Sequence, residues 1–203
     1  MTTPAGEAGY ADVPVRSFLG ALAAGTPAPA AGSAAALVLA QAAALCAKAA
    51  RLSARQLTAD RADRLVKEAE QIRTQAASLI DEDPRAYRAV IDQNRRAGPQ
   101  SGGESGAAGR ADGLAAALSA AADVPLRVVE LAVPVASIAA VLAGSGNPAL
   151  RGDAATAGLL AQAAARAAAA LVRINLAGAP SDPRHARAEA WLAVIDERLG
   201  TRS

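Results

Sequence analysis

Alanine fills about 60 of the 203 positions of this chain, far more than in an average protein, and this abundance limits its possible folds. Ala has the highest intrinsic helix propensity, whereas the β-branched and aromatic residues that favour strands are sparse. With one Trp, one Phe and two Tyr, the chain cannot build a large aromatic core. Its helices must instead pack closely through Ala, Leu and Val. The composition therefore predicts an all-α fold, an antiparallel helical bundle, and disfavours sheets.

The same composition predicts self-association. A buried Ala removes little apolar surface from water, so at ~25 cal/mol/Å² an Ala-rich monomer gains little free energy from its core. We therefore expect a homodimer or a larger homo-oligomer.

The charges disfavour nucleic acid as a partner. The 21 Lys and Arg residues nearly balance the 19 Asp and Glu residues, and the basic ones are scattered along the chain. A nucleic-acid-binding protein concentrates positive charge on one face and offers aromatic side chains for base stacking, which are almost missing here.

The Cys and His content predicts a protein without a metal, working in the reducing cytoplasm. Cys46 is the single Cys and cannot form an internal disulfide, and one His with one Cys does not make a usual zinc site. The first seven residues lack the pattern of a signal peptide. The most apolar run, residues 34–50, contains Gln41 and Lys48 and depends mainly on Ala. We interpret it as a buried bundle helix and expect no contact with a membrane.

The length fits a single domain. Residues 1–12 are polar and Gly-rich, and we expect them to be disordered ahead of one helical domain over 13–200. Within this domain, Gly, Ser and Pro residues predict a flexible loop at 97–110.

Apolar residues at helical spacing predict five or six helices. Ser33 is expected to cap the second of them, and Ser181 or Asp182 the last. Pro125 and Pro134 interrupt the fourth pattern. The patterns cover about 13–24, 33–52, 57–95, 112–143, 153–176 and 183–199.

The pattern over 57–95 places one acidic residue among apolar ones. At 100° per residue, Asp83 lies in the middle of an apolar stripe about 80° wide, whereas Asp81 points to the opposite face. The stripe consists of Leu65, Ala69, Ile72, Ala76, Leu79, Tyr87 and Val90.

A carboxyl group at such a position is costly unless it is paired or protonated, and burial raises its pKa. Asp83 is therefore a candidate general acid or base. The alternative is a structural ion pair with one of the many Arg residues. Pro84 follows directly and either begins a new helix or kinks the existing one, at a cost of ~3 kcal/mol.

Five short segments carry distinctive residues in order, at 26–36, 79–87, 124–126, 146–154 and 173–176. They contain Thr-Pro-Ala-Pro-Ala-Ala-Gly-Ser, Leu-Ile-Asp-Glu-Asp-Pro-Arg-Ala-Tyr, Val-Pro-Leu, Gly-Asn-Pro followed by Gly-Asp, and Arg-Ile-Asn-Leu. Together they resemble the formimidoyltetrahydrofolate cyclodeaminase/methenyltetrahydrofolate cyclohydrolase family, over about residues 14–199.

The resemblance implies an all-helical folate one-carbon enzyme without metal or cofactor. Its small-molecule substrate would be a tetrahydrofolate derivative with a one-carbon unit between N5 and N10, opened by a cyclohydrolase or closed by a cyclodeaminase. The family's proposed acid corresponds to Asp83. The residues expected at the substrate are Gly32, Ser33, Arg55 near the glutamate tail, Tyr87, Asn147, Asp153 and Asn175.

Some of these residues have structural alternatives. Asp153 and Ser33 are also ordinary helix N-cap residues. Asp153 and Asn175 would lie ~33 Å apart along one helix, so they cannot serve one site within a single subunit. Ala30 and Ala31 replace two of the three glycines of the family's loop. The scaffold and its acid could thus serve cyclisation or C–N hydrolysis of a non-folate substrate, or the chain could be a non-catalytic helical dimer.

Overall fold

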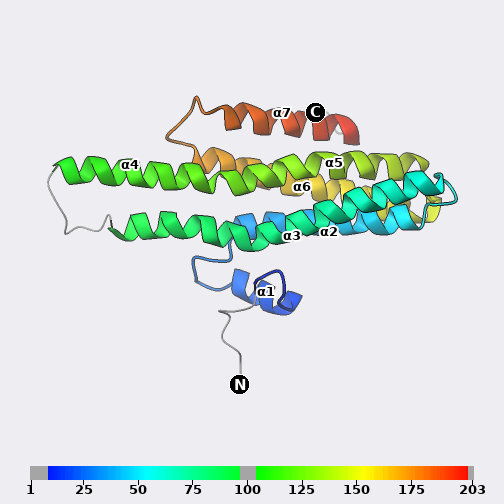
Figure 1. The fold of residues 1–203 in the computed structure, drawn as a ribbon, viewed down its shortest axis with the longest axis horizontal. Helices are drawn as coiled ribbons and strands as arrows, with labels where there is room; N and C mark the ends of the chain where they lie inside the picture. Colours follow the sequence, from blue (N-terminus) through cyan, green and yellow to red (C-terminus); the bar gives the residue numbers. More distant parts are fainter. Residues whose placement is uncertain (1–8, 97–103, 201–203) are drawn as a thin grey trace, which may run out of the picture.

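Helices form all regular elements in the part of the chain that the structure describes, a computed structural model covering residues 9–96 and 104–200, and the all-α prediction is confirmed. The elements, coloured along the chain in Figure 1, are α1 (Val15–Leu22), α2 (Ala31–Arg51), α3 (Ala59–Arg96), α4 (Glu104–Ala121), α5 (Asp123–Ser145), the 3₁₀ turn η1 (Pro148–Leu150), α6 (Arg151–Asn175) and α7 (Pro183–Leu199).

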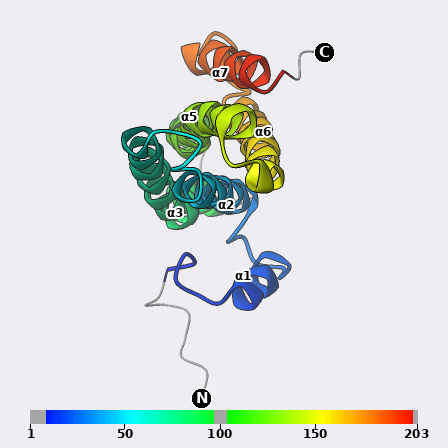
Figure 2. The same cartoon turned by 90° about the vertical axis from the view of Figure 1, so that its right-hand side faces the viewer.

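Helix α2 is the central helix of the bundle and packs against α3, α5 and α6. Figure 2 views these four helices end on, with α7 beyond α5 and α6, and α1 on the opposite side. Close packing on three neighbours is possible because α2 buries small side chains. The fully buried Ala residues of α2 are Ala36, Ala42, Ala43, Ala47 and Ala50.

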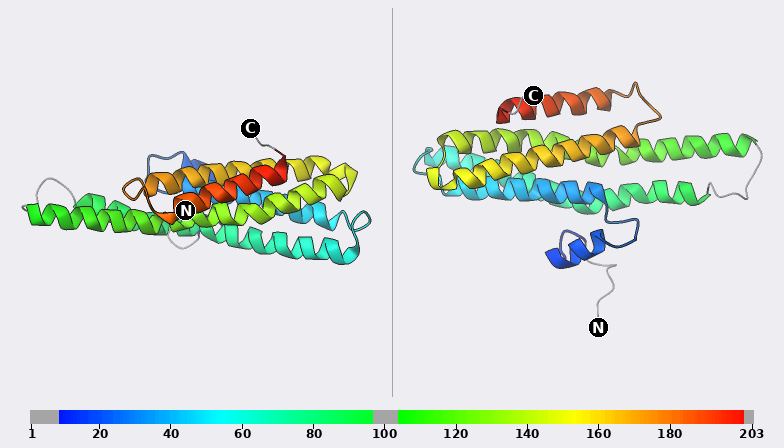
Figure 3. Two further views of the ribbon diagram at one scale, coloured as in Figure 1. Left: turned by 90° about the horizontal axis from the view of Figure 1, so that it is seen from above. Right: turned by 180° about the vertical axis from the view of Figure 1, so that it is seen from behind.

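Helices α3 and α4 project beyond the other helices at one end of the bundle (Figure 1). The view from behind in Figure 3 shows α2 starting beside the middle of α3, while α3 and α4 continue past it. A separate small core of Val90, Ala117 and Ala121 joins the two. We call this projecting pair, α3 beyond Val90 together with α4, the arm.

Two predicted irregular segments are shorter than expected. The loop predicted at 97–110 is helical from Glu104 onward, because α4 packs against α3 despite its glycines; residues 97–103 lie outside the described residues. The disorder predicted for 1–12 does not hold for 9–12, since the backbone N–H of Tyr10 donates to Asp81 and its ring packs edge-on against Phe18. Residues 1–8 lie outside the described residues.

The predicted helix caps are correct at one of three positions. Asp182 caps α7, where its side chain accepts the backbone N–H of Arg184 at 2.9 Å. Ser33 is not an N-cap, because α2 begins two residues earlier. Asp153 is not one either, since η1 leads directly into α6 and places this residue in the first turn.

Proline does not end α3. The helix runs continuously from Ala59 to Arg96 with Pro84 inside it, so the alternative of a new helix at this proline is wrong. The pattern predicted over 112–143 is divided at Ala122, and Pro125 sits in the first turn of α5, where its missing N–H has no helical partner to lose.

Three helical stretches are long and apolar enough to cross a membrane by length and composition. They are Ala31–Arg51, Gly109–Ser145 and Pro148–Asn175, and 61%, 56% and 44% of their most apolar windows are buried inside the fold. The expectation of no membrane contact stays a prediction.

Candidate active site

A cavity of about 310 Å³ opens where the start of α2, the middle of α3 and the end of α6 meet. Its wall is mainly apolar, and Asp83 supplies its one carboxyl group among the described residues. The lining residues are Pro27, Ala28, Ala30, Ala31, Gly32, Asp83, Pro84, Tyr87, Ile91, Pro125, Leu171, Ile174 and Asn175.

Pro84 explains how α2 and α3 are joined at this point. Proline has no N–H, so the carbonyl of Ile80, one turn earlier, loses its helical hydrogen bond. The hydroxyl of Ser33 donates to that carbonyl at 2.8 Å, and this side chain is fully buried. Ser33 thus ties the first turn of α2 to the carbonyl that the proline leaves free.

The same serine holds the carboxylate of Asp83. The backbone N–H of Ser33 donates to Oδ2 of Asp83 at 3.1 Å, and its hydroxyl oxygen lies 3.4 Å from the same atom. The short bond to Ile80 takes the hydroxyl proton, so the backbone N–H is the main donor to the carboxylate. Asp83 therefore caps α2 from a neighbouring helix, satisfying an N–H that has no partner within α2.

Burial raises the pKa of Asp83 above its ordinary value, and the hydrogen bonds from Ser33 lower it in part. Burial dominates because the surrounding wall is apolar and disfavours the charged form. No Lys, Arg or His belongs to the described wall of the cavity, and no ion pair of Asp83 is present within the described residues. A carboxyl group in this setting can hold a proton at higher pH than usual and release it to a bound substrate.

The carboxylate of Asp83 occupies the space that a side chain at residue 32 would need. A Cβ atom at Gly32 would lie 1.8 Å from Oδ1 and 2.3 Å from Cγ of Asp83. No side chain fits at that distance, so Asp83 can reach the start of α2 because residue 32 is glycine.

Ala30 and Ala31 take up their positions without backbone strain. Ala30 is extended, with φ of −136°, and α2 begins at Ala31. None of the described residues other than Gly200 has a positive φ. Both residues line the cavity next to Gly32.

Asn175 and Tyr87 complete the polar part of the wall. The side-chain amide of Asn175 donates to the carbonyl of Ala121, at the end of α4, at 3.2 Å. This bond fixes the amide and leaves its oxygen able to accept a hydrogen bond from a ligand. Tyr87, 40% exposed, lies one turn beyond Asp83 on the same side of α3.

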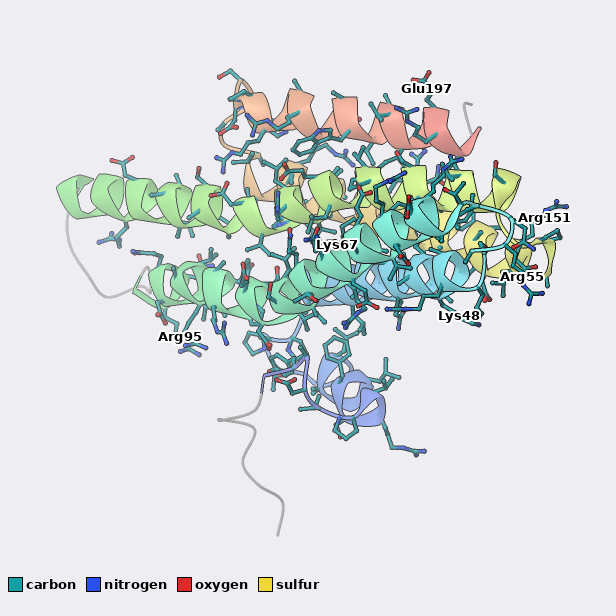
Figure 4. The ribbon with its side chains drawn as sticks, turned by 45° about the vertical axis from the view of Figure 1, so that its right-hand side comes forward. Lys48, Arg55, Lys67, Arg95, Arg151 and Glu197 are labelled. Carbon is teal, nitrogen blue, oxygen red and sulfur yellow. The ribbon has the colours of Figure 1, made fainter. Side chains whose placement is uncertain are left out.

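Three predicted site residues lie at the other end of the bundle. Figure 4 shows Arg55 there, near Lys48 and Arg151, at the end where α2 finishes. The 21 residues of α2 span about 30 Å, which separates these side chains from the cavity at its start. Within one subunit Arg55, Asn147 and Asp153 therefore do not belong to this cavity.

Asn147 and Asp153 have structural contacts at that far end. Asn147 donates to the carbonyl of Leu52 at 3.1 Å, and its backbone N–H donates to the hydroxyl of Ser53 at 2.8 Å. Asp153 forms an ion pair with Lys48 at 2.7 Å. These bonds fasten the turn between α5 and α6 to the end of α2.

Much of the apolar wall was not predicted from the sequence. Ile91 lies two turns beyond Asp83, and Leu171 lies one turn before Asn175, so helical spacing could have found both. Pro27 and Ala28 come from the loop before α2, whose path the sequence does not specify.

Other reactive groups lie elsewhere. No three His, Cys, Asp or Glu side chains gather as metal ligands in the described ranges. Cys46 is buried in α2, and burial raises the pKa of its thiol to about 12, so it is not a nucleophile at neutral pH.

The sequence model of the formiminotransferase-cyclodeaminase family matches residues 14–190. The chain belongs to this family. The fold is similar to the 2.80 Å crystal structure of formiminotetrahydrofolate cyclodeaminase from Thermotoga maritima, with a TM-score of 0.74 and 22% sequence identity. The match covers 93% of this chain and 96% of that one. The curated proteins contain no match. Family membership confirms the resemblance based on the five short segments.

Proposed function

We propose that this family member is a folate one-carbon enzyme acting at the N5/N10 bridge of tetrahydrofolate derivatives. The observation that supports this most is the single desolvated carboxyl group, Asp83, in an apolar cavity of a chain from this family. The related Thermotoga maritima protein is a formiminotetrahydrofolate cyclodeaminase.

Either reaction at this bridge needs one proton moved at nitrogen. Cyclodeamination joins N10 to the formimino carbon carried on N5 and expels ammonia, while cyclohydrolase action adds water to the methenyl carbon and breaks one C–N bond. We propose that Asp83 gives the proton to the departing nitrogen and takes one back in the reverse direction. Such a transfer needs neither metal nor redox cofactor.

The start of α2 supplies further groups for binding. The first N–H groups of a helix have no partner within it and carry partial positive charge. Asp83 uses the N–H of Ser33, so the N–H groups of Ala31 and Gly32, at the wall of the cavity, are the ones left for a carbonyl oxygen of the pterin. We assign the oxygen of Asn175 to a ring N–H.

Activity assays with single variants test the role of Asp83. Wild-type protein should change the absorbance of methenyltetrahydrofolate, or produce it from formiminotetrahydrofolate, above the uncatalysed rate. Asp83→Asn keeps the shape but cannot exchange the proton, so turnover should fall on the order of 10²–10⁴-fold. Glu82→Gln is the matched control, because Glu82 is exposed on the same turn and should keep full activity.

Inactivity of the wild type on both folates would refute the folate proposal. Full activity of Asp83→Asn would instead refute the role of the acid. Loss of the fold in this variant would show that the carboxylate serves mainly to hold α2.

The methyl groups of Ala30 and Ala31 favour a second candidate, the same acid acting on a non-folate substrate by cyclisation or C–N hydrolysis. Both residues line the cavity beside Gly32, where the family's loop has glycines. If a pterin binds there, the double variant Ala30→Gly with Ala31→Gly should bind folate more tightly. Unchanged or weaker binding, measured by calorimetry, would favour the non-folate substrate.

We further propose that the protein acts in the cytoplasm as a homodimer or larger homo-oligomer. A large apolar side chain on α6 supports association, since Leu159 is 61% exposed and lies away from the cavity. Sedimentation at micromolar concentration should show a species larger than 20.1 kDa. A monomer alone would contradict the proposal.

A further inference from the structure

The cavity around Asp83 is too small and too apolar to hold a whole folate. Its volume of about 310 Å³ is at the lower end of the ~300–1,000 Å³ of ligand cavities. Folates carry a pterin, a p-aminobenzoyl group and a glutamate with two carboxylates. The described wall contains no cation to meet those carboxylates, and Arg55 lies at the far end of the bundle.

Two Arg residues lie on the edge of α3 that borders the cavity. Residues at i, i+4, i+7 and i+11 share one side of a helix. Pro84 and Ile91 line the cavity, and Arg88 and Arg95 complete that series. Arg88 lies between the two lining residues along this edge, and Arg95 lies one turn beyond the second.

The direction of this row leads out of the cavity onto the arm. At 1.5 Å per residue, Arg88 and Arg95 lie about 7.5 Å and 18 Å beyond Asp83 along the axis of α3. Figure 4 shows Arg95 on the underside of α3, the side on which α1 lies. Both side chains are exposed, and neither forms an ion pair within the described residues.

We propose that Arg88 and Arg95 bind the carboxylates of the substrate's glutamate tail, which leaves the cavity along α3. This inference rests on the proposed function. The pterin and its one-carbon unit stay beside Asp83, and the p-aminobenzoyl group spaces the carboxylates away from the apolar wall. Guanidinium groups suit this task because their N–H donors match a carboxylate in pairs. Arg88 and Arg95 are binding residues and take no part in proton transfer.

Steady-state kinetics test the proposal with the folate that the wild type turns over, methenyl- or formiminotetrahydrofolate, and with the matching pteroate, which lacks the glutamate. Arg88→Gln should raise KM for the folate about two- to fivefold, as for an exposed charge pair, and leave kcat within about twofold. Arg95→Gln should act in the same direction, and the double variant should show a larger effect. Kinetics with the pteroate should not change in any of these variants. Arg64→Gln, exposed on the same helix and distant from the cavity, is the matched control.

Each outcome of these kinetics supports or refutes the proposed role of Arg88 and Arg95. If Arg88→Gln and Arg95→Gln leave KM for the folate unchanged, the carboxylates bind elsewhere and the inference is wrong. If they impair both substrates equally, the role is structural and the inference is again wrong. If wild-type protein turns over neither methenyltetrahydrofolate nor formiminotetrahydrofolate, the proposed function fails, and this inference fails with it. A higher KM for the folate but not for the pteroate would support the inference, provided that the difference from wild type disappears at high salt.

Discussion

Replacement of Gly32 by Ala tests whether the position of Asp83 determines activity. The added Cβ would lie 1.8 Å from Oδ1, and ordinary contact begins at 3.4 Å, so the carboxylate must move by about 1.6 Å. A misplacement of about 1 Å in a catalytic group costs on the order of 10²-fold in rate. We therefore expect Gly32→Ala to lose at least that factor in kcat on the folate substrate. The hydrogen bond from Ser33 to Asp83 should also weaken.

Gly152→Ala provides a closely matched control. Gly152 is the second residue of α6, as Gly32 is of α2, and a Cβ there meets nothing within 4 Å. Gly152→Ala should keep full activity and gain roughly 0.5–1 kcal/mol of stability from the higher helix propensity of Ala. Thermal unfolding of both variants separates a displaced acid from a lost fold. Normal kcat in a folded Gly32→Ala protein would refute the reasoning.

Three further perturbations have expected outcomes. Burial raises the pKa of Asp83, so the free energy of unfolding of the wild type should fall as pH rises through that folded-state pKa. Urea titrations at several pH values should show this fall in the wild type and not in Asp83→Asn. The side-chain hydrogen bond with Arg184, followed by its backbone N–H, lowers the pKa of Asp182 to about 2. Asp182→Asn should therefore remove stability that the wild type has above the unfolded-state pKa and loses toward pH 2, as acid unfolding would show. Ser33→Ala should lower the free energy of unfolding by about 1–3 kcal/mol. The loss should be smaller in the Pro84→Ala background, where residue 84 regains an N–H for the carbonyl of Ile80. Equal losses in both backgrounds would contradict the link between Ser33 and Pro84.

Helical periodicity was enough to predict the fold and to single out Asp83. The position of this residue in an apolar stripe follows from spacing within one helix, which a sequence displays directly. The structure places Asp83 in a mainly apolar cavity, whereas its role as the acid stays a prediction. The ion-pair alternative is not supported within the described residues, since the partner of Asp83 is Ser33 of α2.

Contacts between helices were harder to predict. Ser33 was expected as a cap of its own helix, but it donates to Ile80, because Pro84 frees that carbonyl. Sequence shows that such a carbonyl exists, but not which side chain will reach it. Arg55 was placed with the substrate although 30 Å of helix separates it from the cavity. That distance depends on the direction of packing, which short sequence segments do not contain.

The two carboxylates of Asp81 and Asp83 have a consequence for how chain length can vary in relatives. Two residues apart on a helix, they point about 200° away from each other. Asp81 accepts the backbone N–H of Tyr10, and Asp83 accepts that of Ser33. The chain from Tyr10 to Ser33 is therefore a loop with both ends bound to a single turn of α3. Loop closure is insensitive to length, since a doubling costs only about 0.6 kcal/mol. Insertions around α1 should therefore be tolerated, whereas one residue inserted between the two aspartates would rotate one of them by about 100° and open the loop.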